Sequence, residues 1–258
     1  MTRLLLRAPA KRYSQVEMDI KMTTPTSVKP PINKWKRNKR RLIRHYLPFS
    51  IVAGLIIAAF LAYFPGESLV QKWSMGTAYA GLTLLGFTLL VGAIHVLRSR
   101  PNPLSSDLTR DAGIMATIVS VVHVGVGLFV HLGNPLYYFI FPPEEARLIP
   151  LRYDPFGLTN WVGLAGTLIL IVLFATSNDY SLRKLGKTRW KTLQRSNYIL
   201  FGFVALHGIV YQLLEKRTVP FIILLLIMIG VVTILQLAGF RLRRLEKARK
   251  MPNEDLDI

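Results

Sequence analysis

The chain has 258 residues, of which 51% are hydrophobic, and its 33 Lys and Arg outnumber 14 Asp and Glu to give a formal net charge of +19. It contains no cysteine, which excludes disulfides, cysteine-ligated iron–sulfur clusters, thiol redox chemistry and covalent haem attachment through C-x-x-C-H. Histidine is therefore the main side chain left as a ligand for a redox metal, and five histidines are present.

Residues 1–46 are predicted to form a basic, flexible N-terminal arm on the cytoplasmic side. They hold 13 Lys and Arg against 2 Asp and Glu. The stretch Thr23–Ile32 is rich in Pro, Thr and Ser, which is typical of a flexible segment. The apolar run Leu4–Leu6 is too short for the core of a signal peptide. We expect the arm to be either disordered or docked on a partner.

Six apolar stretches of about 20 residues follow, and each is long enough to cross a hydrocarbon core of about 30 Å. They are Leu47–Phe64, Met75–Leu97, Ala112–Leu132, Leu158–Ala175, Asn197–Leu214 and Val219–Phe240. The runs are continuous, whereas barrel strands alternate polar and apolar residues. The sequence therefore predicts an all-α integral membrane protein whose residues 47–240 form a six-helix transmembrane bundle in contact with membrane lipid.

The basic residues fall on alternate connections between these stretches. Residues 1–46, 98–111, 178–195 and 241–258 carry balances of +11, +1, +5 and +2, which together account for the whole excess. The positive-inside rule then predicts a multi-pass inner-membrane protein with both termini cytoplasmic. Residues 241–258 form the basic cytoplasmic tail, of which Arg241–Lys250 is expected to continue the sixth helix. The charge is explained by topology and anionic lipid, so no nucleic acid partner is expected.

Two histidines lie inside apolar stretches, where an ionisable side chain is costly and indicates a functional site. His123 lies 13 residues beyond Arg110, and His207 lies 12 residues beyond Arg195. On parallel helices each imidazole is then about 18–20 Å from its basic anchor, so the two rings share one depth and are suited to bind haem iron from both faces. Small neighbours, Gly125 and Gly127 in one case and Gly202, Ala205 and Gly208 in the other, favour close approach of a flat ring or another helix. The alternative is a pair of core histidines hydrogen-bonded to neighbouring helices.

The other three histidines have less specific settings. His45 lies in the basic run before the first apolar stretch and is expected at lipid headgroup level. His95 lies at the cytoplasmic end of the second stretch. His131 follows His123 by eight residues, which on one helix places both on roughly the same face about 12 Å apart. We expect an interfacial histidine there, with contact to a haem propionate or an electron-transfer partner as alternatives.

The stretch from Phe87 to Tyr211 resembles the ferric-reductase-like transmembrane domain family, and within it the haem-binding membrane subunits of bacterial periplasmic methionine sulfoxide reductase systems. The resemblance is carried by Arg110-Asp111-Ala112-Gly113-Ile114 leading to His123, and by Thr176–His207, which contains R-x-L-G, W-K-x-L and R-x-x-Y elements. It implies a bis-histidyl b-type cytochrome with His123 and His207 as the iron ligands, and with Gly127 and Arg195 as further haem-binding residues.

This chain departs from the family pattern at a second, inner haem site. The histidine that commonly follows W-K-x-L is replaced here by Gln194, and Thr109 and Arg110 stand at the equivalent start of the third stretch. An amide is a poor haem ligand, so the resemblance implies one haem b rather than two. His95 could serve an inner site but has no obvious partner histidine.

The sequence accordingly favours an electron-transfer subunit of an oxidoreductase system rather than a standalone enzyme. The electron donor is expected to be a quinol, a flavoprotein docking on Asn178–Arg195 or a cofactor-bearing partner subunit, and an acceptor or partner subunit implies a hetero-oligomeric complex. The alternative is a haem-free structural subunit that retains the fold. A transporter or proton pump is disfavoured because no Asp or Glu falls within the six predicted stretches.

Overall fold

The computed structural model describes residues 34–64, 67–98, 107–145 and 147–250, and within them every extended regular element is a helix. The chain divides into two compact units, Met1–Lys39 and Arg40–Ile258, and the second contains the helical bundle. Six helices of the described part are long and apolar enough to cross a membrane. The predicted all-helical class with six candidate membrane-spanning helices is thereby confirmed. Residues 1–33 of the predicted arm and residues 251–258 of the tail lie outside the described residues.

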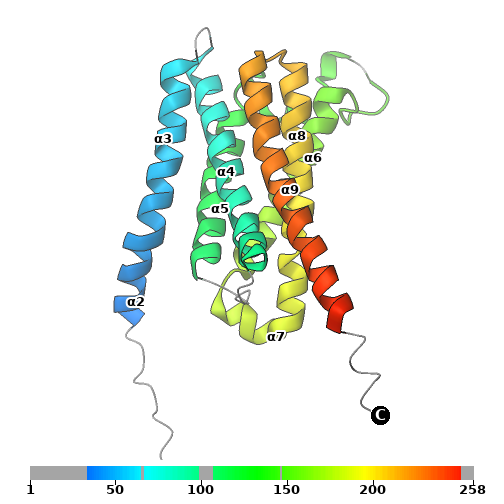
Figure 1. Cartoon of the computed structure of the whole chain (residues 1–258). Helices are drawn as coiled ribbons and strands as arrows, with labels where there is room; N and C mark the ends of the chain where they lie inside the picture. The colour runs from blue at the N-terminus through cyan, green and yellow to red at the C-terminus, as the bar shows by residue number, and fades with distance from the viewer. Residues whose placement is uncertain (1–33, 65–66, 99–106, 146, 251–258) are drawn as a thin grey trace, which may run out of the picture. The chain divides into compact units, whose positions relative to one another are not determined.

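The helices follow one another in a simple order along the chain (Figure 1). They are α2 (Lys34–Arg41), the π-helical turn η1 (Leu42–Tyr46), α3 (Leu47–Tyr63), α4 (Leu69–Leu97), α5 (Asp107–Gly127), α6 (Pro155–Thr176), α7 (Asp179–Gln194), α8 (Ser196–Leu214) and α9 (Val219–Lys250). Two short 3-10 turns, η2 (Pro135–Tyr138) and η3 (Pro143–Glu145), lie between α5 and α6.

Helix α4 is the central element of the bundle and packs against α3, α5, α8 and α9. Small side chains allow its close approach to α5, because Ala80 of α4 and Ala116 of α5 are both almost fully buried in one cluster. On its other side Tyr79 joins Phe60, Phe64 and Leu225 in a second buried cluster. Both faces of α4 are therefore covered by neighbouring helices.

Local sequence signals place the starts of two helices earlier than their apolar stretches begin. At α4, the Ser68 hydroxyl accepts a hydrogen bond from the Gln71 backbone N–H, and the Gln71 side chain accepts one from the Ser68 N–H. This capping box starts the helix six residues before Met75. At α6, the Asp154 carboxylate accepts a hydrogen bond from the Gly157 N–H at 2.7 Å, and Pro155 occupies the first helical turn.

The third predicted stretch is corrected at both ends. Helix α5 begins at Asp107 rather than Ala112 and ends at Gly127 rather than Leu132. A carboxylate therefore does lie inside a candidate membrane span, since Asp111 is fully buried in α5. Arg41 donates hydrogen bonds to both Asp111 oxygens, and His45 Nδ1 lies 2.6 Å from Asp111 Oδ2. These two partners explain how the carboxylate is accommodated.

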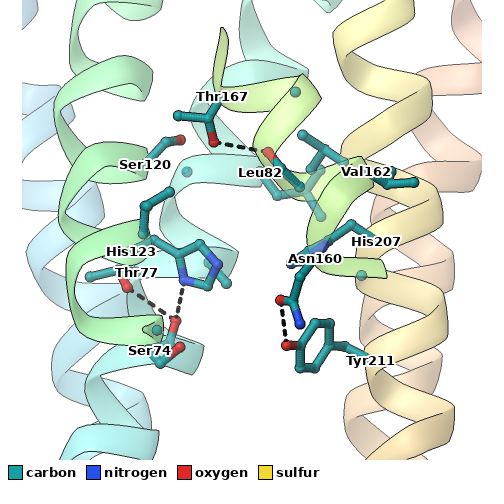
Figure 2. A pocket seen from close by; sticks show the side chains of 18 of the residues that line it. Ser74, Thr77, Leu82, Ser120, His123, Asn160, Val162, Thr167, His207 and Tyr211 are labelled. Atoms are coloured by element: carbon teal, nitrogen blue, oxygen red, sulfur yellow. Dashed lines mark hydrogen bonds between the residues drawn. The ribbon is translucent and has the colours of Figure 1, made fainter. Parts of the chain in front are cut away.

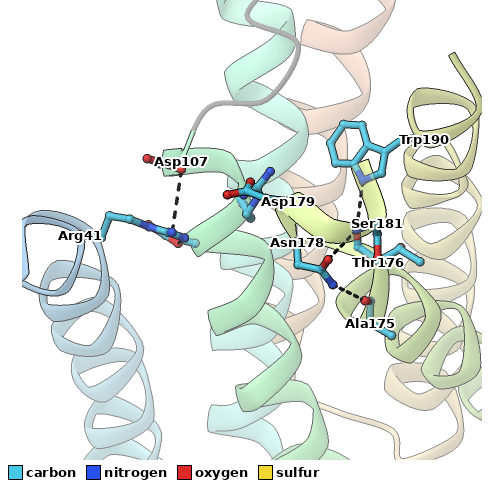
Figure 3. Close-up of polar contacts among 10 residues, drawn as sticks. Arg41, Asp107, Ala175, Thr176, Asn178, Asp179, Ser181 and Trp190 are labelled. Atoms are coloured by element: carbon cyan, nitrogen blue, oxygen red, sulfur yellow. Dashed lines mark hydrogen bonds and ion pairs between the residues drawn. The ribbon is translucent and has the colours of Figure 1, made fainter. Parts of the chain in front are cut away.

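The basic segment Asn178–Arg195, expected as a connection, is mostly helical. It forms α7, with a kink at Gly186, whose φ of +71° is a left-handed conformation that favours glycine. The Asn178 side chain caps the helix by accepting from the Ser181 N–H. Trp190 Nε1 donates to the Thr176 carbonyl at 3.0 Å, and Asp179 pairs with Arg110 of α5 at 2.5 Å (Figure 3). These contacts attach α7 to the ends of α5 and α6. The expected continuation of the sixth helix is confirmed, because α9 runs without a break to Lys250.

Candidate functional site

His123 of α5 and His207 of α8 face each other across a cavity. Their ring centroids are 6.5 Å apart and the ring planes are nearly perpendicular, at 84°. The cavity has a volume of about 230 Å³ and is bounded by α4, α5, α6 and α8. Figure 2 shows His123 on one wall and Asn160, His207 and Tyr211 on the opposite wall. Two histidines 84 residues apart in the sequence are thus brought to one site.

Each imidazole is oriented by a backbone carbonyl on a neighbouring helix. His123 Nδ1 lies 3.0 Å from the Ser74 carbonyl oxygen of α4, and His207 Nδ1 lies 2.9 Å from the Thr159 carbonyl oxygen of α6. A carbonyl only accepts, so Nδ1 carries the proton in both rings. Nε2 therefore keeps its lone pair, which is the arrangement that metal-ligating histidines use.

The distance between the rings fits two imidazoles that share one metal ion. An imidazole nitrogen binds a metal at about 2 Å, and the ring centre lies about 1.2 Å behind that nitrogen, so a linear arrangement separates the centroids by about 6.4 Å. The distance in the protein is 6.5 Å. Among the described residues no group of three or more His, Cys, Asp and Glu could hold a bare ion. The histidine pair could therefore contribute two protein ligands to a metal-containing group.

Glycine at position 163 makes room for one of these rings. A Cβ built on Gly163 of α6 would lie 2.8 Å from both Cε1 and Nδ1 of His207, closer than real Cβ contacts allow. Thr159, whose carbonyl accepts from His207, is one helical turn before Gly163. The His207 imidazole therefore packs directly against this turn of α6. Sequence analysis missed Gly163, because nothing in its apolar stretch indicates which helix it faces.

The glycines that were singled out from the sequence differ in their surroundings. Gly127 lines the cavity, and a Cβ there would lie 4.0 Å from His123 Cε1. Gly125 and Gly202 have open space where a Cβ would point. A Cβ on Gly208 would contact Leu225 of α9 rather than a histidine. Gly127 and Gly208 both line the cavity, but of these glycines only Gly127 would bring a Cβ within 4.0 Å of a histidine ring.

Polar and aromatic residues continue from His207 to one end of the cavity. The Tyr211 ring lies 4.8 Å from the His207 ring and stacks on the His131 ring at 6.4 Å. The Tyr211 hydroxyl donates to Asn160, and His131 Nε2 lies 3.1 Å from Glu215. The prediction that His131 shares a helix face with His123 is wrong, because α5 ends at Gly127 and His131 lies beyond it. It reaches the cavity end from a turn instead.

The remaining candidate residues lie away from the histidine pair. Arg195 does not line this cavity but a second one, together with Gln194. The His45 ring pairs with buried Asp111. His95 Nδ1 lies 2.7 Å from the Val91 carbonyl within its own helix. Neither His45 nor His95 lines the cavity that holds His123 and His207.

Comparison with known proteins gives a limited result. No protein-family model matches the chain. A segment of 48 residues is 46% identical to part of the magnetosome protein MamZ of Magnetospirillum gryphiswaldense. The match covers 19% of this chain and 7% of MamZ. This similarity is local and leaves the function to be argued from the site.

Proposed function

We propose that the protein is a membrane-embedded b-type cytochrome subunit that passes electrons to a partner, with His123 and His207 as the residues that would hold one haem. The observation that carries the proposal is the histidine pair itself. Its centroids are 6.5 Å apart, and each Nδ1 is held by a backbone carbonyl so that Nε2 is available. A haem bound there would supply one-electron redox chemistry.

The residues around the pair have separate roles in this proposal. The Ser74 and Thr159 carbonyls fix the tautomer and orientation of each imidazole and raise its basicity. Gly127 and Gly163 leave the space that the two rings and a flat macrocycle need. Apolar lining residues such as Leu82 and Phe203 exclude water, and the low polarity sets the range of the redox potential. Arg195 has no haem-binding role in the proposal, because it lines the second cavity.

The wider setting follows from the sequence and forms part of the proposal. We place the chain in the ferric-reductase-like family on the motif residues between Phe87 and Tyr211. The distribution of basic residues supports cytoplasmic termini in a cell inner membrane. The donor is a quinol or a flavoprotein, and the chain acts with an acceptor or partner subunit in a hetero-oligomeric complex. The protein itself binds, orients and insulates the redox group rather than converting a substrate.

An optical experiment tests this function. The protein is purified in detergent from cells supplied with haem precursor, and its reduced-minus-oxidised spectrum and pyridine haemochrome content are measured. We expect a low-spin b-type spectrum at about one haem per chain. His123→Ala and His207→Ala should each abolish that spectrum, whereas His95→Ala should retain it because His95 does not line the cavity.

Two results would contradict the proposal. Folded wild-type protein without haem would favour the alternative, a structural subunit that keeps the fold without redox function. A haem that survives loss of both cavity histidines would place the group elsewhere in the chain. Gel filtration and circular dichroism of each variant separate loss of haem from loss of fold.

A further inference from the structure

A second cavity lies at the other end of the histidine cavity and is lined by α4, α5, α6, α7 and α8. It also has a volume of about 230 Å³. Leu85, Ala116 and Leu170 line both cavities, so the two cavities are adjacent. Trp190 of α7 is buried in its wall and is held by the hydrogen bond to Thr176. The cavity is thus a defined part of the bundle with no role in the proposed cytochrome function.

Its charged lining is entirely basic. Arg110, Lys191 and Arg195 line the cavity, and no Asp or Glu is among its lining residues. Asp179 outside the lining offsets the charge of Arg110. Within the part of the chain that the structure describes, no ion pair involves Lys191 or Arg195. Lys191 and Arg195, both solvent-exposed, therefore give the cavity an excess of positive charge beside an apolar wall, which attracts an anion.

A buried hydrogen-bond donor points to the same kind of ligand. Gln194 Nε2 is fully buried and has no hydrogen-bond partner among the described residues. A buried N–H without an acceptor is costly. An acceptor oxygen from a ligand would satisfy the Gln194 amide.

We propose that this cavity binds the phosphate group of an anionic lipid. Lys191 and Arg195 supply the charge, Gln194 donates a hydrogen bond to a phosphate oxygen, and the wall around Trp190, Leu173 and Phe174 contacts the apolar part of the lipid. Basic residues near a membrane surface attract anionic headgroups. The proposal is independent of haem binding, because none of these residues contacts the histidine pair.

Lipid binding to delipidated protein, followed by native mass spectrometry, tests the proposal. The probes are phosphatidylglycerol and phosphatidylcholine with identical acyl chains. We expect wild-type protein to bind one phosphatidylglycerol at least about tenfold more tightly than phosphatidylcholine. The double variant Lys191→Ala/Arg195→Ala should lose that preference. The neutral change Gln194→Leu should weaken binding severalfold without altering the net charge.

A matched control removes the same charge from neighbouring positions. Arg183 and Lys187 of α7 are exposed, as Lys191 and Arg195 are, but they do not line the cavity. Arg183→Ala/Lys187→Ala should therefore change phosphatidylglycerol binding less than about twofold if the cavity is the site. An equal loss in both double variants would overturn the proposal, because it would indicate attraction to the helix surface alone. Retained preference in the Lys191→Ala/Arg195→Ala variant would overturn it as well.

Inorganic phosphate distinguishes the source of the phosphate group. The unfolding temperature is measured in phosphate and in chloride of equal ionic strength. If phosphate raises it for wild-type protein but not for Lys191→Ala/Arg195→Ala, the site also binds free phosphate. An effect of phosphatidylglycerol alone assigns the site to lipid headgroups. Absence of both effects in folded wild-type protein would refute an anion site in this cavity.

Discussion

Replacement of Gly163 by alanine is the most informative single change at the histidine pair. The added Cβ would lie 2.8 Å from Cε1 and Nδ1 of His207. Ordinary contacts between such atoms are about 3.5–4.0 Å, so the imidazole must retreat by about 0.7 Å or more. The ring cannot retreat without weakening its 2.9 Å hydrogen bond to Thr159, which belongs to the same helix as Gly163. The substitution therefore perturbs both the position and the orientation of the ligand.

The expected consequence is a large loss of haem affinity with little loss of fold. Ligand positions need to be held within about 0.5 Å, and disturbing the groups that orient a metal-ligating histidine costs about 10- to 100-fold in metal affinity. Titration of haem-depleted protein with haem, followed by optical absorption, measures this change. We expect Gly163→Ala to bind haem at least about tenfold more weakly than wild type.

Gly202→Ala provides the control on the helix that carries His207. A Cβ at position 202 meets nothing within 4 Å, so this variant should bind haem within about twofold of wild type while making the same glycine-to-alanine change in a helix. If Gly163→Ala and Gly202→Ala bind haem equally well, the contact between α6 and His207 does not position the ligand. The reasoning from Gly163 would then be refuted.

Three further predictions concern the surrounding framework. Asp111→Asn should destabilise the protein by about 3 kcal/mol in a denaturant titration, because it leaves the Arg41 charge without its buried partner. Asp107→Asn should have an effect below about 1 kcal/mol in the same titration, because Asp107 lies 4.0 Å from Arg41 and 43% of its side chain is exposed. Tyr79→Phe should cost about 1 kcal/mol, measured by thermal unfolding in detergent, because its hydroxyl donates to the Phe221 carbonyl and accepts from Gln212. Gln194→His should leave the haemochrome stoichiometry near one, and a value of two would show that a single histidine restores an inner haem.

The membrane helices were predictable because their signal is local. A continuous apolar run of about 20 residues is visible in the composition of the segment itself. The errors occur where a polar contact or a cap extends or ends a helix. The start of α4 depends on the Ser68 and Gln71 capping box, and the start of α5 includes Asp111 because Arg41, 70 residues away, neutralises it.

The candidate site was predictable only in part. His123 and His207 stand out because ionisable residues are rare in apolar helices, and counting from the basic anchors gives them similar depths. The carbonyls of Ser74 and Thr159 and the space at Gly163 depend on which faces of α4 and α6 turn toward the histidines. A single sequence does not contain that rotational information, since both helices are apolar on all sides. The two cavities likewise emerge only from packing.

The most direct test of the central claim is the electron paramagnetic resonance spectrum of the oxidised, haem-loaded protein at low temperature. Ligation by two imidazoles gives low-spin iron. The two rings are nearly perpendicular, at 84°, so they donate into different iron d orbitals, and those orbitals stay close in energy. We therefore predict a low-spin signal of unusually large anisotropy, at about one spin per chain, that disappears in His207→Ala. A high-spin signal in the wild-type protein would contradict ligation by both His123 and His207.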